Sequence, residues 1–237
     1  MPRIYSDQAL HTGVTLTLSR EASRHIQVLR MQPGHSLQLF DGRGGEFEAT
    51  IALIGRQSVE VQVGAHHAVE RESQRAVHLA VCMPANERMD WLVEKATELG
   101  AASITPLMSQ RSVVRLSGDR ANKKQAHWQA VAVSACEQCG RNRVPTIALP
   151  QPLGTWLTNQ APTATTRYVL SLQTNDTDTG HTLANNTSEM WVLNGPEGGL
   201  SAPEEAQALA AGWQPMSLGA RVLRAETAAL AALMRLA

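Results

Sequence analysis

Three glycines in one short segment near the C-terminus are the first candidates for a binding role. They lie in Asn194-Gly195-Pro196-Glu197-Gly198-Gly199-Leu200, directly after a buried apolar run. Glycines allow the backbone to approach a ligand, and the pair Ser201 and Glu204 predicts a capped helix start just beyond. The spacing matches neither a dinucleotide G-x-G-x-x-G nor a Walker loop. The segment is therefore either a ligand-binding loop or a tight connection.

A second candidate is the charged segment Leu218 to Glu226, which contains Gly219, Arg221, Val222, Leu223 and Arg224. It joins a short predicted strand, Met216 to Leu218, to a predicted C-terminal helix, Arg224 to Leu236. Loops at the carboxyl ends of neighbouring parallel strands meet at one crevice, where α/β proteins bind ligands. The two segments are predicted to form one pocket if their strands are neighbours. The alternative is a solvated helix start with paired surface charges.

Positive charge gathers between positions 111 and 143, where seven basic residues face only Asp119 and Glu137. Over the whole chain, 21 basic residues balance 21 acidic ones, so there is no global attraction to nucleic acid or to anionic membranes. Clustered Arg and Lys still allow a neutral protein to hold a phosphate backbone. The cluster is therefore a candidate RNA-binding surface, although charge runs are often only solvated faces.

The composition is that of a folded cytoplasmic protein. Apolar residues make up 43% of the 237 residues, and no apolar run approaches the roughly 18 residues that a membrane span needs. Met1 to Leu10 contains no apolar run of the kind found in secretory signals. Three cysteines fit a reducing compartment. Cys136 and Cys139 form a C-x-x-C, but no second ligand pair accompanies them, so buried thiols are expected and no metal.

Two domains are expected, with residues 1–72 as a small β-barrel and residues 73–237 as an α/β domain. Alternating apolar residues predict strands in the first, at Val14 to Leu18, Ser36 to Phe40, Phe47 to Leu53 and Ser58 to Val63, with one helix near Glu21 to Leu29. Closing these strands into an antiparallel barrel removes exposed edges. The polar stretch Gly64 to Gln74 marks the boundary.

Strands and helices alternate after Ala76, which predicts a mainly parallel sheet. Strands are predicted at Val77 to Met83, Ile104 to Leu107, Tyr168 to Leu172 and Met190 to Leu193, and helices near Glu87 to Leu99, Asn122 to Cys139 and Ser201 to Ala211. The composition of the polar segment Gln173 to Glu189 predicts mobility or disorder.

Several of these segments resemble one known family over nearly the whole chain. The matching runs are Val28-Leu29-Arg30 with Pro33-Gly34, Glu94 to Gly100, Ile104 to Leu107, Ala135 to Arg141, and above all Gly195 to Gly199 and Leu218 to Ala228. They resemble the ribosomal small subunit methyltransferase E family, which methylates N3 of a uridine in 16S ribosomal RNA with S-adenosylmethionine. Two positions depart from its pattern: Ala85-Asn86 replaces a usual lysine, and Ala225 replaces a usual threonine.

The resemblance implies a fold and partners that the patterns alone do not. It implies a PUA-like RNA-binding barrel followed by a SPOUT domain with a C-terminal trefoil knot, assembled as a homodimer on the small ribosomal subunit. A knot is a feature that general topology rules disfavour. The main alternative is a non-catalytic RNA-binding or ribosome-assembly protein that keeps this fold.

The resemblance also implies roles for individual residues. Arg224 is expected to stabilise charge on the uridine carbonyls. Glu197 or Glu226 is expected to accept the proton or to hold Arg224 in place, and a structural role in capping the adjacent turn is the alternative. The expected cofactor contacts are Leu172, Leu193, Asn194, Gly195, Pro196, Glu197, Gly198, Gly199, Leu218, Gly219, Val222, Leu223 and Arg224. The expected RNA contacts are Arg3, Arg24, Arg30, Lys123, Lys124 and Arg141.

Overall fold

The chain divides into two compact units in a computed structural model that describes residues 1–85, 88–159, 165–172 and 188–237. One unit comprises Met1–Glu72 with Val133–Val144, and the other comprises Ser73–Ala132 with Pro145–Ala237. The boundary predicted between residues 72 and 73 placed Val133–Val144 in the second domain, whereas in the structure this segment belongs to the N-terminal unit. Most of the segment Gln173 to Glu189, predicted to be mobile, lies outside the described residues.

The N-terminal unit is built on a five-stranded sheet with the order β1-β3-β4-β5-β2. Its strands are β1 (Arg3–Tyr5), β2 (Thr15–Thr17), β3 (Ser36–Phe40), β4 (Glu46–Ile54) and β5 (Val59–His67). All pairings are antiparallel except β1 with β3, which is parallel. The sequence patterns missed β1 and ended β5 too early, because neither Arg3–Tyr5 nor the polar end of β5 shows a sustained alternation.

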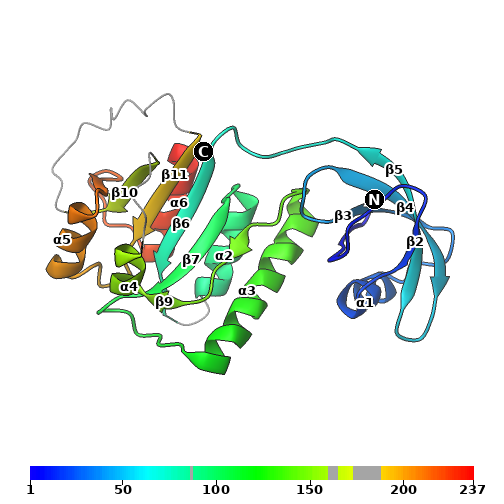
Figure 1. The fold of residues 1–237 in the computed structure, drawn as a ribbon, viewed down its shortest axis with the longest axis horizontal. Helices are drawn as coiled ribbons and strands as arrows, with labels where there is room; N and C mark the ends of the chain where they lie inside the picture. The colour runs from blue at the N-terminus through cyan, green and yellow to red at the C-terminus, as the bar shows by residue number, and fades with distance from the viewer. Residues whose placement is uncertain (86–87, 160–164, 173–187) are drawn as a thin grey trace. The chain divides into compact units, whose positions relative to one another are not determined.

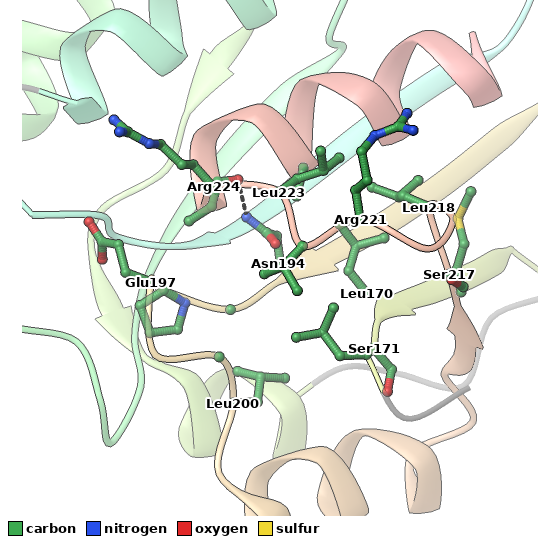
Figure 2. Close-up of a pocket in the computed structure, with 18 of the residues that line it drawn as sticks. Leu170, Ser171, Asn194, Glu197, Leu200, Ser217, Leu218, Arg221, Leu223 and Arg224 are labelled. Atoms are coloured by element: carbon green, nitrogen blue, oxygen red, sulfur yellow. Dashed lines mark hydrogen bonds between the residues drawn. The ribbon is translucent and has the colours of Figure 1, made fainter. Parts of the chain in front are cut away.

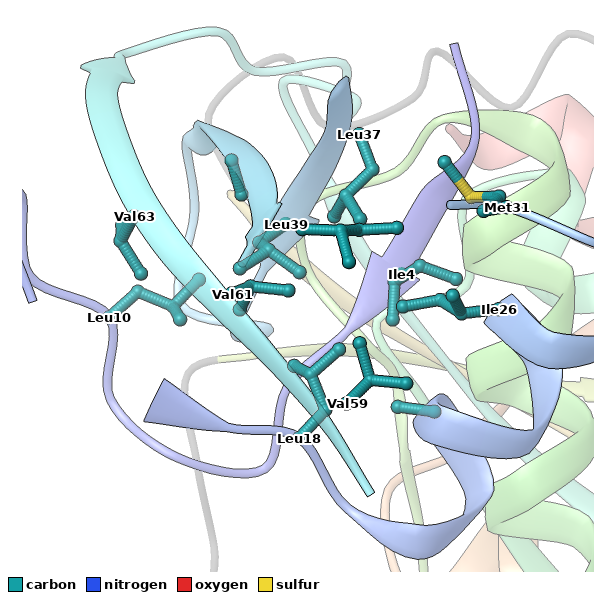
Figure 3. Close-up of a cluster of buried hydrophobic side chains, with 13 residues drawn as sticks. Ile4, Leu10, Leu18, Ile26, Met31, Leu37, Leu39, Val59, Val61 and Val63 are labelled. Atoms are coloured by element: carbon teal, nitrogen blue, oxygen red, sulfur yellow. The ribbon is translucent and has the colours of Figure 1, made fainter. Parts of the chain in front are cut away.

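Helix α1 (Arg20–Val28) packs on this sheet and closes its core. The Ser19 hydroxyl oxygen accepts a hydrogen bond from the Ala22 amide at 3.2 Å and caps the helix. Figure 3 shows Ile26 of α1 directed towards Ile4, Val59 and the other buried side chains of the strands. The alternation that predicted the strands is therefore the alternation that buries one face of each.

The C-terminal unit contains a seven-stranded sheet in which every pairing is parallel. The main order is β12-β10-β11-β6-β7-β8, with β9 beside β7 (Figure 1). The strands are β6 (Ala76–Cys82), β7 (Ser103–Met108), β8 (Thr146–Ile147), β9 (Gln151–Pro152), β10 (Thr166–Leu170), β11 (Glu189–Asn194) and β12 (Gln214–Met216). The sequence patterns missed β8 and β9 because two residues give no period.

The helices of this unit are α2 (Arg88–Glu98), α4 (Leu153–Thr158), α5 (Ala202–Ala210) and α6 (Ala225–Leu236), and α3 (Gly118–Cys139) crosses the division between the units. Helix α6 packs on β11, β6 and α2, behind the sheet in Figure 1. Helices α4 and α5 contribute Trp156 and Ala208 to a cluster with Leu193. The sequence patterns missed α4, which is only six residues long.

Three neighbouring strands end at the same edge of this sheet. Because β12, β10 and β11 are adjacent and parallel, their carboxyl ends at Met216, Leu170 and Asn194 point the same way. The two glycine-bearing segments follow two of these ends. The sheet order thus brings together loops that are far apart in the sequence. Across the described residues, no helix is long and apolar enough to cross a membrane.

Candidate functional site

A cavity of about 310 Å³ opens at this edge of the C-terminal sheet. Its wall is made by the residues that follow β10, β11 and β12, together with the start of α6 (Figure 2). Most lining side chains are apolar, and the peptide groups of the two glycine-bearing segments supply polar atoms. The lining residues are Leu170, Ser171, Leu172, Asn194, Gly195, Pro196, Glu197, Gly199, Leu200, Met216, Ser217, Leu218, Gly219, Arg221, Val222, Leu223, Arg224, Ala225 and Ala228.

A buried hydrogen bond ties the two glycine-bearing segments together. The Asn194 Nδ2 group donates to the Ala225 carbonyl oxygen at 2.8 Å, and both residues are buried (dashed line in Figure 2). Asn194 is the last residue of β11, and Ala225 is the first of α6. The bond therefore fixes the start of α6 against the first segment.

Gly195 is required by close packing within its own loop. A Cβ atom at this position would lie 2.8 Å from the Leu200 amide nitrogen and 3.0 Å from the Gly199 carbonyl carbon, closer than such atoms approach. Gly199 is required for another reason: its φ is +69°, in the left-handed region, and its amide donates to the Pro196 carbonyl at 2.8 Å. Together these two glycines shape the loop that walls the cavity.

Most of the predicted cofactor residues line this cavity, but Leu193 and Gly198 do not. The Leu193 side chain is buried in the core cluster beside Trp156. The Gly198 carbonyl oxygen accepts a hydrogen bond from the Arg111 Nη1 group at 2.6 Å, on the outside of the loop. The sequence patterns did not indicate Leu170, Ser171, Met216, Ser217 and Ala228, because their place in the wall depends on which strands are neighbours.

Arg88 connects the two glutamates that were proposed as proton acceptors. Its Nη1 group lies 3.1 Å from Glu197 Oε1, which also accepts the Ala85 amide at 3.0 Å. Its Nε lies 4.0 Å from Glu226 Oε1. Glu226 does not line the cavity, and its Oε2 is buried with no hydrogen-bond partner among the described residues. No sequence pattern pointed to Arg88, because it lies more than 100 positions away from both carboxylates.

Arg224 lines the cavity at the start of α6, and its side chain is exposed. Figure 2 shows the side chains of Arg224 and Arg221 extending to opposite sides of the cavity. Within the described part of the chain, Arg224 forms no salt bridge, so Glu197 and Glu226 hold Arg88 and not Arg224. This corrects the suggestion that either glutamate positions Arg224.

Two of the six predicted RNA contacts are engaged inside the N-terminal unit: the Arg3 side chain is 10% exposed, and Arg141 is buried. Arg3 lies 2.5 Å from Glu46 and donates to Asn142 Oδ1 at 2.7 Å, while Arg141 forms a two-pronged pair with Glu72. These guanidinium groups hold the unit together and do not face solvent. An RNA role for Arg3 and Arg141 is therefore not supported, whereas the other four residues are exposed: Arg24, Arg30, Lys123 and Lys124.

The C-x-x-C pair lies at the end of α3. Cys136 is buried, and burial raises the pKa of its thiol to about 12, which keeps it protonated at neutral pH. Its Sγ lies 3.6 Å from the Arg143 carbonyl oxygen. In the described ranges, no group of three or more His, Cys, Asp or Glu side chains is arranged to hold a metal ion.

Comparison with known proteins now identifies the family. A family model for an RNA methyltransferase domain matches residues 71–237, and one for an RNA methyltransferase PUA domain matches residues 18–64. Ribosomal RNA small subunit methyltransferase E from Buchnera aphidicola subsp. Schizaphis graminum is 32% identical over 237 residues, covering 100% of this chain and 95% of its own length. The chain belongs to the ribosomal RNA small subunit methyltransferase E family. It thus combines a PUA-like domain with an α/β methyltransferase domain.

Two solved structures are similar over the full length. The methyltransferase E of Neisseria gonorrhoeae, bound to S-adenosyl methionine, is 34% identical with a TM-score of 0.88, covering 98% of this chain and 95% of that one. A Legionella pneumophila protein in complex with the cofactor SAM is 36% identical with a TM-score of 0.92, covering 99% of this chain and 96% of that one. Both relatives were therefore solved with the methyl donor bound.

Proposed function

We propose that this chain uses S-adenosylmethionine to methylate N3 of a uridine in 16S ribosomal RNA of the small ribosomal subunit. Family membership supports the reaction, and the two relatives that hold S-adenosylmethionine support the cofactor. The observation that carries the proposal is that both glycine-bearing segments, joined by the Asn194–Ala225 bond, line one cavity at the carboxyl edge of the sheet.

The cavity fits the proposed cofactor. Its volume of about 310 Å³ suits a small molecule, and apolar side chains such as Leu200 and Leu223 offer surfaces for an adenine ring. Gly195 lets the loop pack closely on itself at the cavity wall, because a Cβ there would lie 2.8 Å from the Leu200 amide nitrogen. Residues that would hold the cofactor are Leu172, Asn194, Gly195, Pro196, Glu197, Gly199, Leu218, Gly219, Val222, Leu223 and Arg224.

The bound cofactor supplies an electrophilic methyl group on a positively charged sulfur. The protein must hold the uridine N3 in line with that methyl group, and such positioning supplies much of the rate. Negative charge develops on the uracil carbonyl oxygens as N3 loses its proton, so a nearby cation stabilises the transition state. Arg224, exposed at the rim and without a salt bridge among the described residues, has this role in our proposal.

Glu197 is the better placed of the two glutamates to accept the N3 proton. It lines the cavity, and its hydrogen bonds from Ala85 and Arg88 both fall on Oε1. Its Oε2 atom can then face the substrate. Glu226 lies behind the wall in the first turn of α6, where a negative charge interacts favourably with the helix N-terminus, and its role is to hold Arg88.

The finer architecture implied by the family is part of the same proposal. We infer that residues 73–237 form a SPOUT domain with a C-terminal trefoil knot, that residues 1–72 form a PUA-like RNA-binding barrel, and that the protein acts as a cytoplasmic homodimer. Arg24, Arg30, Lys123 and Lys124 are the exposed residues proposed to contact RNA.

Mass spectrometry of ribosomal RNA tests the reaction directly. Small subunits from a deletion strain should lack one N3-methyluridine, and adding back the gene should restore it. Purified protein with S-adenosylmethionine should also methylate subunits from the deletion strain in vitro. RNA binding without methylation in both assays would instead support the non-catalytic alternative.

Single-turnover methylation by two variants tests the role of Arg224. Arg224→Ala should slow the reaction by about 100-fold, because a charge-stabilising contact near the reacting group is lost. Arg221→Ala, which removes a guanidinium extending to the other side of the cavity, should slow it much less. Full activity in Arg224→Ala would remove this residue from the mechanism.

A further inference from the structure

A second cavity, of about 790 Å³, lies within the C-terminal unit and has no role in the proposal so far. Its wall is formed by residues just after β6, by α2, by the segment before α3 and by the first half of α3. The wall carries two indole rings, Trp91 and Trp128, and two cations, Arg88 and Lys124. None of the described residues that line it is acidic. An aromatic, positively charged cavity of this kind suits a nucleotide.

The two tryptophans differ in their freedom to bind. Trp128 is buried: its Nε1 donates to Asp90 Oδ1 at 2.8 Å, and Lys124 Nζ lies 5.9 Å from its ring centroid. Burial raises the pKa of the Asp90 carboxyl, but hydrogen bonds from His127 and Trp128 outweigh it and lower the pKa overall. Trp128 is therefore a fixed wall between α2 and α3.

Trp91 leaves a large aromatic surface open to solvent. Its side chain is 46% exposed, whereas Met89 and Leu92 beside it on α2 are buried in the core. Folding does not require an indole on the solvent face of this helix. An exposed indole at the edge of a cationic cavity can stack on any base, since every base has a flat apolar face.

An ion pair connects the walls of the two cavities. Arg88 lines the second cavity, and Glu197 lines the first. The Arg88 Nη1 group lies 3.1 Å from Glu197 Oε1, so the two side chains form a salt bridge. A nucleotide in the second cavity would thus lie next to a base that approaches the cofactor at the first. Neighbouring unpaired nucleotides of one RNA strand can reach both places.

We propose that the second cavity binds an unpaired nucleobase of the substrate RNA beside the methylated base, with Trp91 as the stacking surface and Lys124 as a phosphate contact. This inference rests on the proposed function and adds a second subsite to it. A second copy of this chain is the other occupant that would cover Trp91, and the test below separates the two.

Full-length Trp91→Ala, Trp91→Phe and Leu149→Ala proteins provide the test, with small subunits from the deletion strain as substrate. Leu149 is the control, because it is 52% exposed in the same unit and outside the cavity. Trp91→Ala should raise KM for the subunits about tenfold or more. Trp91→Phe should restore most of the loss, and kcat and the affinity for S-adenosylmethionine should stay near wild type.

Two outcomes would overturn the proposal. One is a KM in Trp91→Ala equal to that of Leu149→Ala. The other is a lower molar mass of Trp91→Ala by light scattering, which would mean that the indole packs against a second copy. Photocross-linking of 4-thiouridine-substituted small-subunit RNA to the wild-type chain gives a readout independent of catalysis and of variant folding. We expect cross-links on Trp91; their absence, even in a protein that does not methylate, counts against the subsite alone.

Discussion

The Asn194 side-chain amide donates a hydrogen bond of 2.8 Å to the Ala225 carbonyl oxygen, across 31 positions of the sequence. Asn194 is 4% exposed and Ala225 is 6% exposed, so water does not compete for the bond. It joins the carboxyl end of β11 to the first turn of α6. The proposed cofactor pocket is therefore one mechanical unit, because neither of its glycine-bearing walls can shift without breaking this bond.

Replacing Asn194 should loosen both walls of the pocket. Asn194→Ala removes the donor and leaves the buried Ala225 carbonyl with only its hydrogen bond inside α6, and the loss of such a bond costs about 0.5–1.5 kcal/mol. Asn194→Asp should be worse, because an ionised carboxylate would then face the carbonyl oxygen. We expect both variants to unfold at a lower temperature than wild type and to bind S-adenosylmethionine more weakly by calorimetry. The unfolding temperature and the affinity should both be lowest in Asn194→Asp, intermediate in Asn194→Ala and highest in wild type.

Asn159→Ala is the matched control, because Asn159 is exposed at the end of α4 in the same unit and outside the pocket. It should bind the cofactor as wild type does. Equal affinity in Asn194→Ala and wild type would contradict the structural role given to this bond.

The glycines near the pocket should respond differently to alanine. Gly195→Ala places a Cβ 2.8 Å from the Leu200 amide nitrogen, so the loop must move, and binding of S-adenosylmethionine should fall at least about tenfold. Gly199→Ala meets no atom within 4 Å, but its φ of +69° strains the backbone by about 1 kcal/mol. We expect a smaller loss of affinity there, measured by calorimetry.

Gly212→Ala separates backbone strain from damage to the pocket. Gly212 has a φ of +86°, has open space around its Cβ position and does not line the cavity. It should lose stability like Gly199→Ala while keeping full affinity for the cofactor. The interpretation fails if Gly212→Ala and Gly195→Ala lose affinity equally.

Local patterns in the sequence were enough to predict the longer elements. Alternating apolar residues gave β3 at Ser36–Phe40, and the capping box at Ser201 gave the start of α5. These signals lie within about ten residues of one another, which is the range over which periodicity and capping act. The short strands β1, β8 and β9 lack such a signal, because two or three residues are too few to show a period.

The site divides in the same way. The glycine segments were visible because a strand, a loop and a helix start follow one another in the chain. The salt bridge of Arg88 with Glu197 could not be predicted from the sequence. Arg3 was predicted to contact RNA, but in the structure its guanidinium group pairs with Glu46 inside the N-terminal unit. A charged side chain shows its type in the sequence, but only the tertiary structure shows which partner neutralises it.

Lysines at the start of α3 should contribute to the salt dependence of RNA binding. Lys123 and Lys124 are exposed, and each phosphate contact that is lost should reduce the slope of log K against log salt by about one. The double variant Lys123→Gln/Lys124→Gln should thus bind small-subunit RNA more weakly and with a flatter slope in filter-binding titrations.

Lys95→Gln is the control, because Lys95 is the only other lysine in the chain and forms salt bridges with Glu94 and Glu98 on α2. The slope of log K against log salt measured for Lys95→Gln should match that of wild type. An unchanged slope in the double variant would exclude these lysines from the RNA-binding surface.

The N-terminal unit should lose an acid-sensitive contribution to its stability when Glu46 is replaced. Burial alone raises the pKa of the Glu46 carboxyl, but hydrogen bonds from Arg71 and Arg3 outweigh it and lower the pKa below its usual 4.5. Because the folded pKa is the lower one, this stabilisation is present above about pH 4.5 and is lost as the pH falls through the folded value. Glu46→Gln should cost about 2 kcal/mol at pH 7, and the difference from wild type should shrink in acid.

Hydrogen-exchange mass spectrometry at pH 7 and near pH 3.5 would localise this effect to the strands around Glu46. Glu48→Gln is the control on the same strand, since Glu48 is exposed and pairs with His67 at the surface, where such pairs contribute less than about 1 kcal/mol. Its exchange should follow wild type at both pH values. A destabilisation of Glu46→Gln that is equally large at both pH values would mean that the ionised carboxylate is not what holds Arg3 and Arg71 together.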